Sequence, residues 1–203
     1  MSVQSPATDL RARRRNETRL DIQKAALGLF EQHGFEETTV DEIAREAGVS
    51  PRTFFRYFPT KEESVLFDRY GFDEALRHCV ASSDLTTFAL ADVEKAFCAV
   101  IDSFRDDPSE VASTILRIQR LVTTNSTLST AVIGRCAANS QELLAAVDDE
   151  CGVATRSHVR MVLEIAQVAL QCAFEEWVTT EPGQPDSDLL TIYKKVCVRV
   201  RHL

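Results

Sequence analysis

A short segment, residues 50–58, gathers basic, hydroxyl and aromatic side chains within about two helical turns. Ser50 before Pro51 predicts a helix start, because the serine oxygen accepts a free backbone N–H and proline needs no donor at the first position. Phe54 and Phe58 lie four residues apart and predict the buried side of this helix. The other side then carries Arg52, Thr53, Phe55, Arg56 and Tyr57. Arginine, threonine and aromatic residues on one exposed helical face suit the major groove of DNA.

A second short helix is predicted directly before this one. Thr39 and Glu42 have the spacing of a capping box, which predicts a helix over about 40–47. Gly48 permits a tight turn into the next helix. Two short helices joined by a glycine-containing turn are typical of a helix-turn-helix DNA reader. A first helix over about 18–33 completes a three-helix domain.

From Asn16 to Val65, roughly a quarter of the chain, the sequence resembles the TetR/AcrR family of transcriptional regulators. The matching residues are Ala25, Leu29, Phe30, Gly34, Phe35, Thr38, Thr39, Val40, Ile43, Ala44, Ala47, Gly48, Val49, Ser50, Thr53, Phe54, Phe55, Tyr57, Phe58, Lys61 and Glu62. The resemblance implies an all-α protein of about nine helices, with a three-helix DNA-binding domain and a six-helix ligand-binding and dimerisation domain. It also implies a homodimer on a palindromic operator. Release of a repressor by a small hydrophobic or amphipathic effector is the commoner mode, and activation stays open.

The resemblance also implies which residues contact DNA. They are Arg14, Thr39, Pro51, Arg52, Thr53, Phe55, Tyr57 and Lys61. Thr39, Tyr57 and Lys61 would contact phosphates, which fix the register without reading sequence. Pro51, Arg52 and Thr53, at the start of the helix that follows Ser50, would reach base edges.

Two of these residues need separate comment. Arg52 is the best candidate for specificity, because a bidentate arginine–guanine contact is the commonest specific one. A phosphate-bound or solvated Arg52 is the alternative. Phe55 stands where the family usually has tyrosine. Phenylalanine cannot donate to a phosphate, so it would instead pack on a thymine methyl group or a sugar.

The charge of the chain is unevenly distributed. The net charge is −8, yet residues 1–70 carry 11 Lys or Arg against 12 Asp or Glu, so most of the acidity lies further on. Residues 11–19 hold five arginines and one glutamate. Residues 1–15 are therefore predicted to be a disordered basic arm, with Arg14 reaching the adjacent minor groove. The alternative is a solvated tail without a partner.

The domains that follow are predicted at 16–62 for the DNA reader and 63–203 for the remainder. Six more helices are predicted at about 60–81, 86–106, 109–123, 127–149, 155–179 and 187–202. Residues 196–201 alternate like a strand, but the longer register is helical and no partner strand is evident.

The predicted helix 155–179 has two apolar stripes, so it needs a second partner surface beyond its own protomer. With the last helix it would form a four-helix bundle between two copies, and packing inside a monomer is the alternative. The predicted dimer residues are Val162, Ala166, Ala169, Ala173, Trp177, Ile192 and Val196. The second stripe is Met161, Ile165, Val168 and Cys172. The predicted ligand-pocket residues are Phe72, Phe97, Phe104, Arg117, Arg120, Asn139 and Gln167.

Other classes of protein are disfavoured by the sequence. No nucleophile elbow, phosphate-binding loop or paired Cys/His cluster is present, so an enzyme, a cofactor and a metal are not expected. No apolar run is long enough for a membrane span, and no signal core is seen at the N-terminus, so a cytoplasmic location is expected. The six cysteines are widely spaced and are interpreted as packing residues, with redox sensing or metal binding as alternatives. A relative that binds a protein instead of DNA is the remaining alternative.

Overall fold

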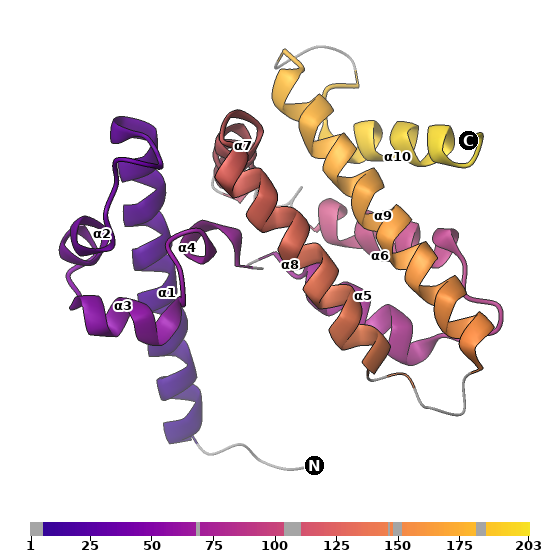
Figure 1. The fold of residues 1–203 in the computed structure, drawn as a ribbon, viewed down its shortest axis with the longest axis horizontal. Coiled ribbons are helices and arrows are strands. Elements are labelled where there is room, and N and C mark those ends of the chain that lie inside the picture. The colour runs from indigo at the N-terminus through magenta and orange to yellow at the C-terminus, as the bar shows by residue number, and fades with distance from the viewer. Residues whose placement is uncertain (1–5, 68–69, 104–110, 146, 148–151, 182–185) are drawn as a thin grey trace. The chain divides into compact units, whose positions relative to one another are not determined.

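The computed structural model describes residues 6–67, 70–103, 111–145, 147, 152–181 and 186–203. It divides into two compact units, Met1–Phe67 and Asp68–Leu203. All regular secondary structure in these described residues is helical, as predicted (Figure 1). The first unit holds α1 (Pro6–His33), α2 (Val40–Glu46), α3 (Pro51–Tyr57) and α4 (Glu63–Leu66). The second holds α5 (Phe72–Ser82), α6 (Leu90–Asp102), α7 (Val111–Thr124), α8 (Ser126–Ala145), α9 (Val153–Thr179) and α10 (Leu189–Val200).

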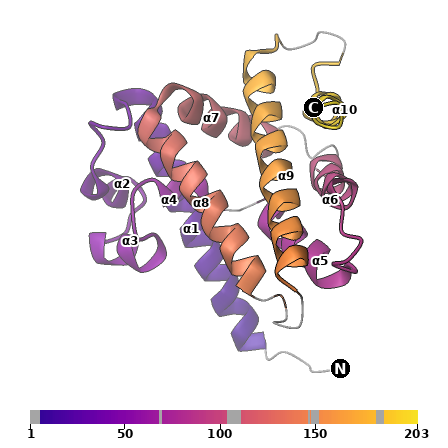
Figure 2. The same cartoon turned by 45° about the vertical axis from the view of Figure 1, so that its right-hand side comes forward.

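In the first unit, α1 packs against α2 and α4, and α2 packs against α3 (Figure 2). Ile22, Ala26 and Phe30 recur at four-residue spacing on α1 and are fully buried, as this spacing requires of one helical face. Ile43 of α2 and Phe54 of α3 are equally buried. Each large apolar side chain buried in this way stabilises the fold by about 1.5–3 kcal/mol. The buried side of α3 is therefore fixed, and its opposite side must face outward.

The predicted caps of α2 and α3 are confirmed. Thr39 Oγ1 accepts the Glu42 N–H at 3.3 Å, while Glu42 Oε2 accepts the Thr39 N–H at 2.9 Å. These bonds from Thr39 hold the pKa of the Glu42 carboxyl below its usual value. Ser50 Oγ accepts the Thr53 N–H at 3.1 Å, and Gly48 adopts φ +66° in the turn. Local chemistry therefore decides where both short helices begin.

The first helix begins earlier than predicted. We expected residues 1–15 to be disordered, but α1 extends from Pro6 to His33. Residues 6–17 lack an apolar stripe but include four arginines and two alanines, which favour helix. Arg13 Nε contacts Glu17 Oε1 at 3.1 Å one turn on, which supports the helix further. The prediction from apolar periodicity missed this segment, in which residues 13–17 are helical and exposed.

The single helix predicted over 60–81 is instead two helices, α4 and α5. This break raises the number of helices in the described residues from the predicted nine to ten. Phe67, which ends α4, has an extended backbone with ψ 141°. Gly71 begins α5 with φ +87°, a left-handed conformation that glycine adopts without strain. A lone glycine in a helical pattern is compatible with both outcomes, so the sequence did not reveal the break.

The second unit is built around α9, which packs against α6, α7, α8 and α10. Helix α9 runs antiparallel to α8 in both views of the chain (Figures 1 and 2). Residues 189–200 form a helix, so the helical interpretation of the final segment is confirmed. Three of its core aromatic rings are close: the Phe72 and Phe97 centroids lie 5.5 Å apart, and Phe97 and Tyr193 6.2 Å apart. Among the described residues, no helix is both long enough and apolar enough to cross a bilayer.

The five described cysteines have thiols of low reactivity. They are Cys79, Cys98, Cys136, Cys172 and Cys197, and Cys151 lies outside the described residues. Burial raises the pKa of each of these five thiols, most clearly that of Cys197, to about 11. Since the thiolate is the reactive form, this favours the packing interpretation over redox sensing.

Cys197 makes the stability of the second unit depend on alkaline pH. Below pH 9, the ordinary thiol pKa, folded and unfolded chains both hold the proton, so stability is complete there. Between pH 9 and pH 11 only the unfolded chain releases it, and the free energy of unfolding falls. Between pH 9 and pH 11, we expect the free energy of unfolding of Cys197→Ala to fall by roughly 2 kcal/mol less than that of the wild-type protein. Denaturant titrations measure this difference. The half-buried Cys172→Ala is the control, and an equal flattening in both variants would contradict the assignment to Cys197.

Candidate nucleic-acid interface

The outward face of α3 carries Arg52, Phe55 and Arg56. These residues are spaced i, i+3 and i+4, so they lie together on one side of the helix, and all three are exposed. Phe55 is 54% exposed and is the one exposed large hydrophobic residue in the described part of the first unit. Two guanidinium groups flanking an exposed ring give a face that reads polar base edges and also packs on apolar ones.

The remaining predicted residues of α3 lie at the edges of this face. Pro51 is exposed at the first position, whereas Thr53 and Tyr57 are half-buried. Thr53 Oγ1 lies 3.0 Å from Ser50 Oγ, within the cap. The Arg56 guanidinium carbon lies 5.2 Å from the Tyr57 ring centroid. The sequence placed Arg56 on the exposed side without giving it a role, and its exposure beside Phe55 makes it a further candidate for DNA contact.

Thr39 is exposed at the start of α2, where a phosphate contact was predicted. Its hydroxyl donates to Glu42 Oε2 at 2.8 Å and also accepts the Glu42 N–H. The hydroxyl is therefore occupied by the capping box, and a phosphate has to replace the Glu42 carboxylate to receive its proton. The predicted contact stays a prediction.

Lys61 does not have the geometry of a phosphate contact. Its Nζ donates to the carbonyl oxygens of Phe35 at 2.7 Å, Thr38 at 3.1 Å and Glu36 at 3.3 Å. It also lies 4.2 Å from the Phe35 ring centroid. An ammonium group has three protons, so these three carbonyls use all of them. A direct phosphate contact of Lys61 would require at least one of these bonds to break, and the predicted contact stays a prediction.

The basic arm divides into an exposed part and a packed part. Arg14 is exposed on α1. Arg19 is half-buried, with its guanidinium carbon 4.5 Å from the Phe67 centroid and 5.4 Å from that of Phe58. A helix is about 10–12 Å across, whereas the minor groove is about 6 Å wide. The helical arm therefore cannot enter the minor groove as an extended arm would, and any contact of Arg14 is made from its outer edge.

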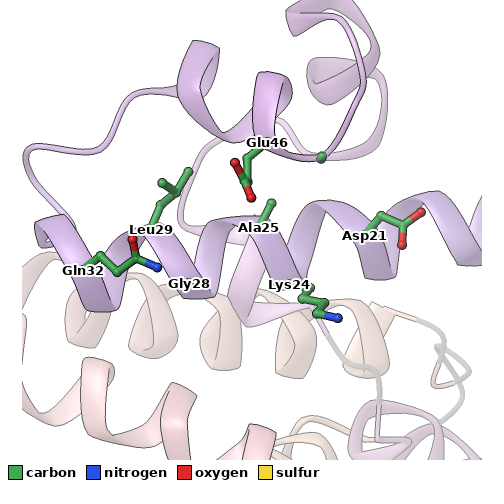
Figure 3. A pocket seen from close by; sticks show the side chains of 8 residues that line it. Asp21, Lys24, Ala25, Gly28, Leu29, Gln32 and Glu46 are labelled. Atoms are coloured by element: carbon green, nitrogen blue, oxygen red, sulfur yellow. The ribbon is translucent and has the colours of Figure 1, made fainter.

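A groove of about 470 Å³ follows α1 beside the end of α2 (Figure 3). Its lining residues are Asp21, Lys24, Ala25, Gly28, Leu29, Gln32, Glu46 and Ala47. In Figure 3, Glu46 lies across from Ala25. None of the residues predicted for the ligand pocket lines this groove, and four of its eight lining residues are polar or charged: Asp21, Lys24, Gln32 and Glu46.

Comparisons with known proteins agree with this geometry. Residues 22–70 match the family model described as "Bacterial regulatory proteins, tetR family". This segment belongs to the TetR family. It covers most of the first unit, including the exposed α3 face, and the residues just beyond that unit.

Two relatives to which this chain is similar are named transcriptional regulators. The HTH-type transcriptional regulator TcmR of Streptomyces glaucescens is 39% identical over 101 residues, covering 50% of this chain and 45% of that protein. HbdR of an Aromatoleum strain is 35% identical over 117 residues, covering 52% and 47%. The matches thus span just under half the length of either relative.

Among solved structures, the chain is similar to Thermus thermophilus FadR, a TetR-family repressor crystallised with lauroyl-CoA. The two are 23% identical with a TM-score of 0.46, over 90% of this chain and 93% of that one. Because this TM-score is below 0.5, no feature of that complex is assigned to this chain.

The predicted ligand-pocket residues that the structure describes lie in separate places. Phe72 and Phe97 are in ring contact within the core, and Phe104 lies outside the described residues. Arg117 is half-buried and Arg120 exposed on α7. Asn139 and Gln167 bind other side chains.

A polar cluster joins α5, α8 and α9. Asp73 accepts from Arg135 Nη2 at 2.6 Å and from Asn139 Nδ2 at 3.1 Å. Gln167 Nε2 donates to the buried Ser140 Oγ at 2.8 Å. Two of the predicted residues, Asn139 and Gln167, thus take part in fixed helix–helix contacts. No sequence signal identified Asp73, because its partners come from a helix more than 60 positions away.

The predicted dimer stripe faces the interior of its own protomer. Six of its members belong to the core: Val162, Ala166, Ala169, Ala173, Ile192 and Val196. Only Trp177 is half-exposed. The second stripe is exposed instead, at 52% for Met161, 37% for Ile165 and 58% for Val168. These six residues are therefore unsuited to the predicted dimer interface, because α6, α7, α8 and α10 cover the alanine-rich side of α9.

Proposed function

We propose that the chain is a ligand-responsive, DNA-binding transcriptional regulator. It binds a palindromic operator as a homodimer, represses, and is released by a small hydrophobic or amphipathic effector. The observation that carries the DNA-binding part is the exposed α3 face of Arg52, Phe55 and Arg56, held outward by the buried Phe54. We assign no catalytic step to it, in keeping with the regulators to which it is similar.

Double-stranded DNA explains this face better than a protein partner does. Arg52 and Arg56 place two guanidinium groups on one side of a short helix that begins with Ser50 and Pro51. DNA supplies guanine edges and phosphates for both groups and thymine methyl groups for Phe55. Affinity then depends strongly on salt, because each neutralised phosphate releases condensed counterions.

A homodimer through α9 completes the proposed regulator. Met161, Ile165 and Val168 are spaced i, i+4 and i+7, so they form one exposed apolar stripe along α9. A second copy of this chain is the occupant that the function requires, because two readers related by a two-fold axis match a palindrome. In such an isologous interface the stripe packs against its own copy.

The proposed function is tested by binding to selected DNA. A random-sequence duplex pool is enriched with the wild-type protein, and the recovered duplex is compared with a scrambled one over a range of salt concentrations. We expect tighter binding to the recovered duplex, weakening linearly on a log–log plot against salt. No enrichment, or equal binding to both duplexes at every salt concentration, would reject DNA reading.

The effector part is tested separately from DNA binding. Small amphipathic molecules, including acyl thioesters, are screened for a rise in melting temperature, since a ligand that binds only the folded state stabilises it. A stabilising molecule should also release the recovered duplex, because a switch requires the ligand to prefer the state that does not bind DNA. A molecule that stabilises the protein yet leaves the duplex bound would not be the effector.

A further inference from the structure

We propose that Lys61 is a positioning residue for DNA binding: it clamps the loop that leads into α2 to the start of α4 and touches no phosphate. This inference rests on the proposed function. The loop concerned is residues 34–39, between the end of α1 and the start of α2.

The loop holds its shape through side chains more than through backbone pairing. Thr38 is 1% exposed, and its Oγ1 donates to the carbonyl oxygen of Gly34 at 2.8 Å. The carbonyl oxygens of Phe35, Glu36 and Thr38 converge on a single atom, Lys61 Nζ. Bonds from a charged donor are roughly twice as strong as neutral ones, so this one cation fixes most of the loop.

The other end of Lys61 is anchored at α4. Its own carbonyl oxygen accepts the Ser64 hydroxyl at 2.5 Å and the Ser64 N–H at 3.2 Å, and Ser64 is fully buried. The main chain of Lys61 is thus fixed to the first turn of α4, while its side chain reaches back 23 to 26 positions in sequence. A shift of the start of α4 therefore moves the loop 34–39 through Lys61. This loop leads directly into α2 and α3.

The cage of acceptors suits lysine and not arginine. An ammonium group directs three protons from one atom, which matches three carbonyls that surround one point. A guanidinium group is a flat fork about as wide as a carboxylate and cannot place three bonds at a single centre. A phosphate contact has the opposite preference, because arginine binds phosphate at least as well as lysine.

The test compares Lys61→Met and Lys61→Arg on the recovered duplex. We expect both variants to bind about tenfold or more weakly than wild type while keeping its salt slope. Lys24→Met is the matched control, because it removes the same charge from an exposed position of α1 and should leave the loop intact. A fall in slope of about 0.9 for each copy, or about 1.8 for the dimer, in Lys61→Met, with binding retained in Lys61→Arg, would show a phosphate contact and overturn the proposal. Wild-type affinity in Lys61→Met would overturn it too.

A second measurement reads the clamp without DNA. Hydrogen exchange in peptides covering 34–43 should accelerate in both Lys61 variants, while peptides from α9 stay unchanged, and Lys24→Met should match wild type. Unchanged exchange in 34–43 would mean that no clamp exists. Failure of the wild-type protein to bind any duplex would instead reject the proposed function, whatever the exchange result. Thermal unfolding confirms that each variant is folded.

Discussion

Val168→Glu is expected to convert the protein from a dimer into a monomer and to abolish specific operator binding. Val168 is 58% exposed at the C-terminal end of the Met161–Val168 stripe of α9, on the surface assigned to the second copy. In a two-fold interface the substitution buries a carboxylate from each copy, without a partner of opposite charge. We expect the dimer dissociation constant to rise about 100-fold or more. Light scattering at micromolar protein measures the change in mass.

Ile133→Glu is the matched control for this variant. Ile133 lies on α8 and is also 58% exposed, so the substitution adds the same charge to an equally exposed apolar position. It should leave the dimer intact. A dimer of unchanged mass in Val168→Glu would contradict the α9 interface, and a monomer in the wild-type protein would contradict dimerisation altogether.

Arg52→Ala is expected to remove most of the discrimination between operator and scrambled DNA. An arginine with a bidentate contact to guanine contributes about 1–3 kcal/mol of discrimination, or roughly fivefold to 150-fold in the ratio of affinities. Arg52 is exposed and has no buried role, so the fold should not suffer. The ratio of affinities for the recovered and scrambled duplexes is the quantity to measure.

Arg52→Lys separates base reading from charge. Lysine keeps the positive charge but lacks the flat fork, so the salt slope should be retained while discrimination falls. Equal losses on both duplexes in Arg52→Ala would reject the base contact and support the phosphate-bound alternative.

The parts of the fold that local chemistry controls were predictable. The capping bonds of Thr39 and Ser50 and the turn at Gly48 lie within four residues of the groups they affect, so the sequence contains their full cause. The α3 face followed from the same logic, because two phenylalanines four apart define the buried side of a two-turn helix. These features sufficed to place Arg52 and Phe55 outward.

Features that depend on distant partners were not predictable. Both stripes of α9 are apolar, and only the packing of α10 and α8 decides that Val162 faces inward and Val168 outward. The role of Lys61 depends on carbonyl oxygens 23 to 26 positions earlier, which no pattern of side chains reveals. The helical start of α1 was missed for a different reason, because an exposed helix needs propensity and ion pairs but no apolar stripe.

Salt affects the cations of the proposed DNA-binding unit in two different ways. Arg52 and Arg56 are exposed, so dissolved ions weaken their attraction to phosphates over a Debye length of about 8–10 Å. The Lys61 ammonium is enclosed by three carbonyls within 3.3 Å and by the Phe35 ring, with little room for an ion to intervene. A rise in ionic strength therefore loosens the grip on DNA while the loop before α2 keeps its conformation. The proposed DNA-binding unit therefore keeps its binding conformation in high salt, and we expect it to bind DNA again when the salt is diluted.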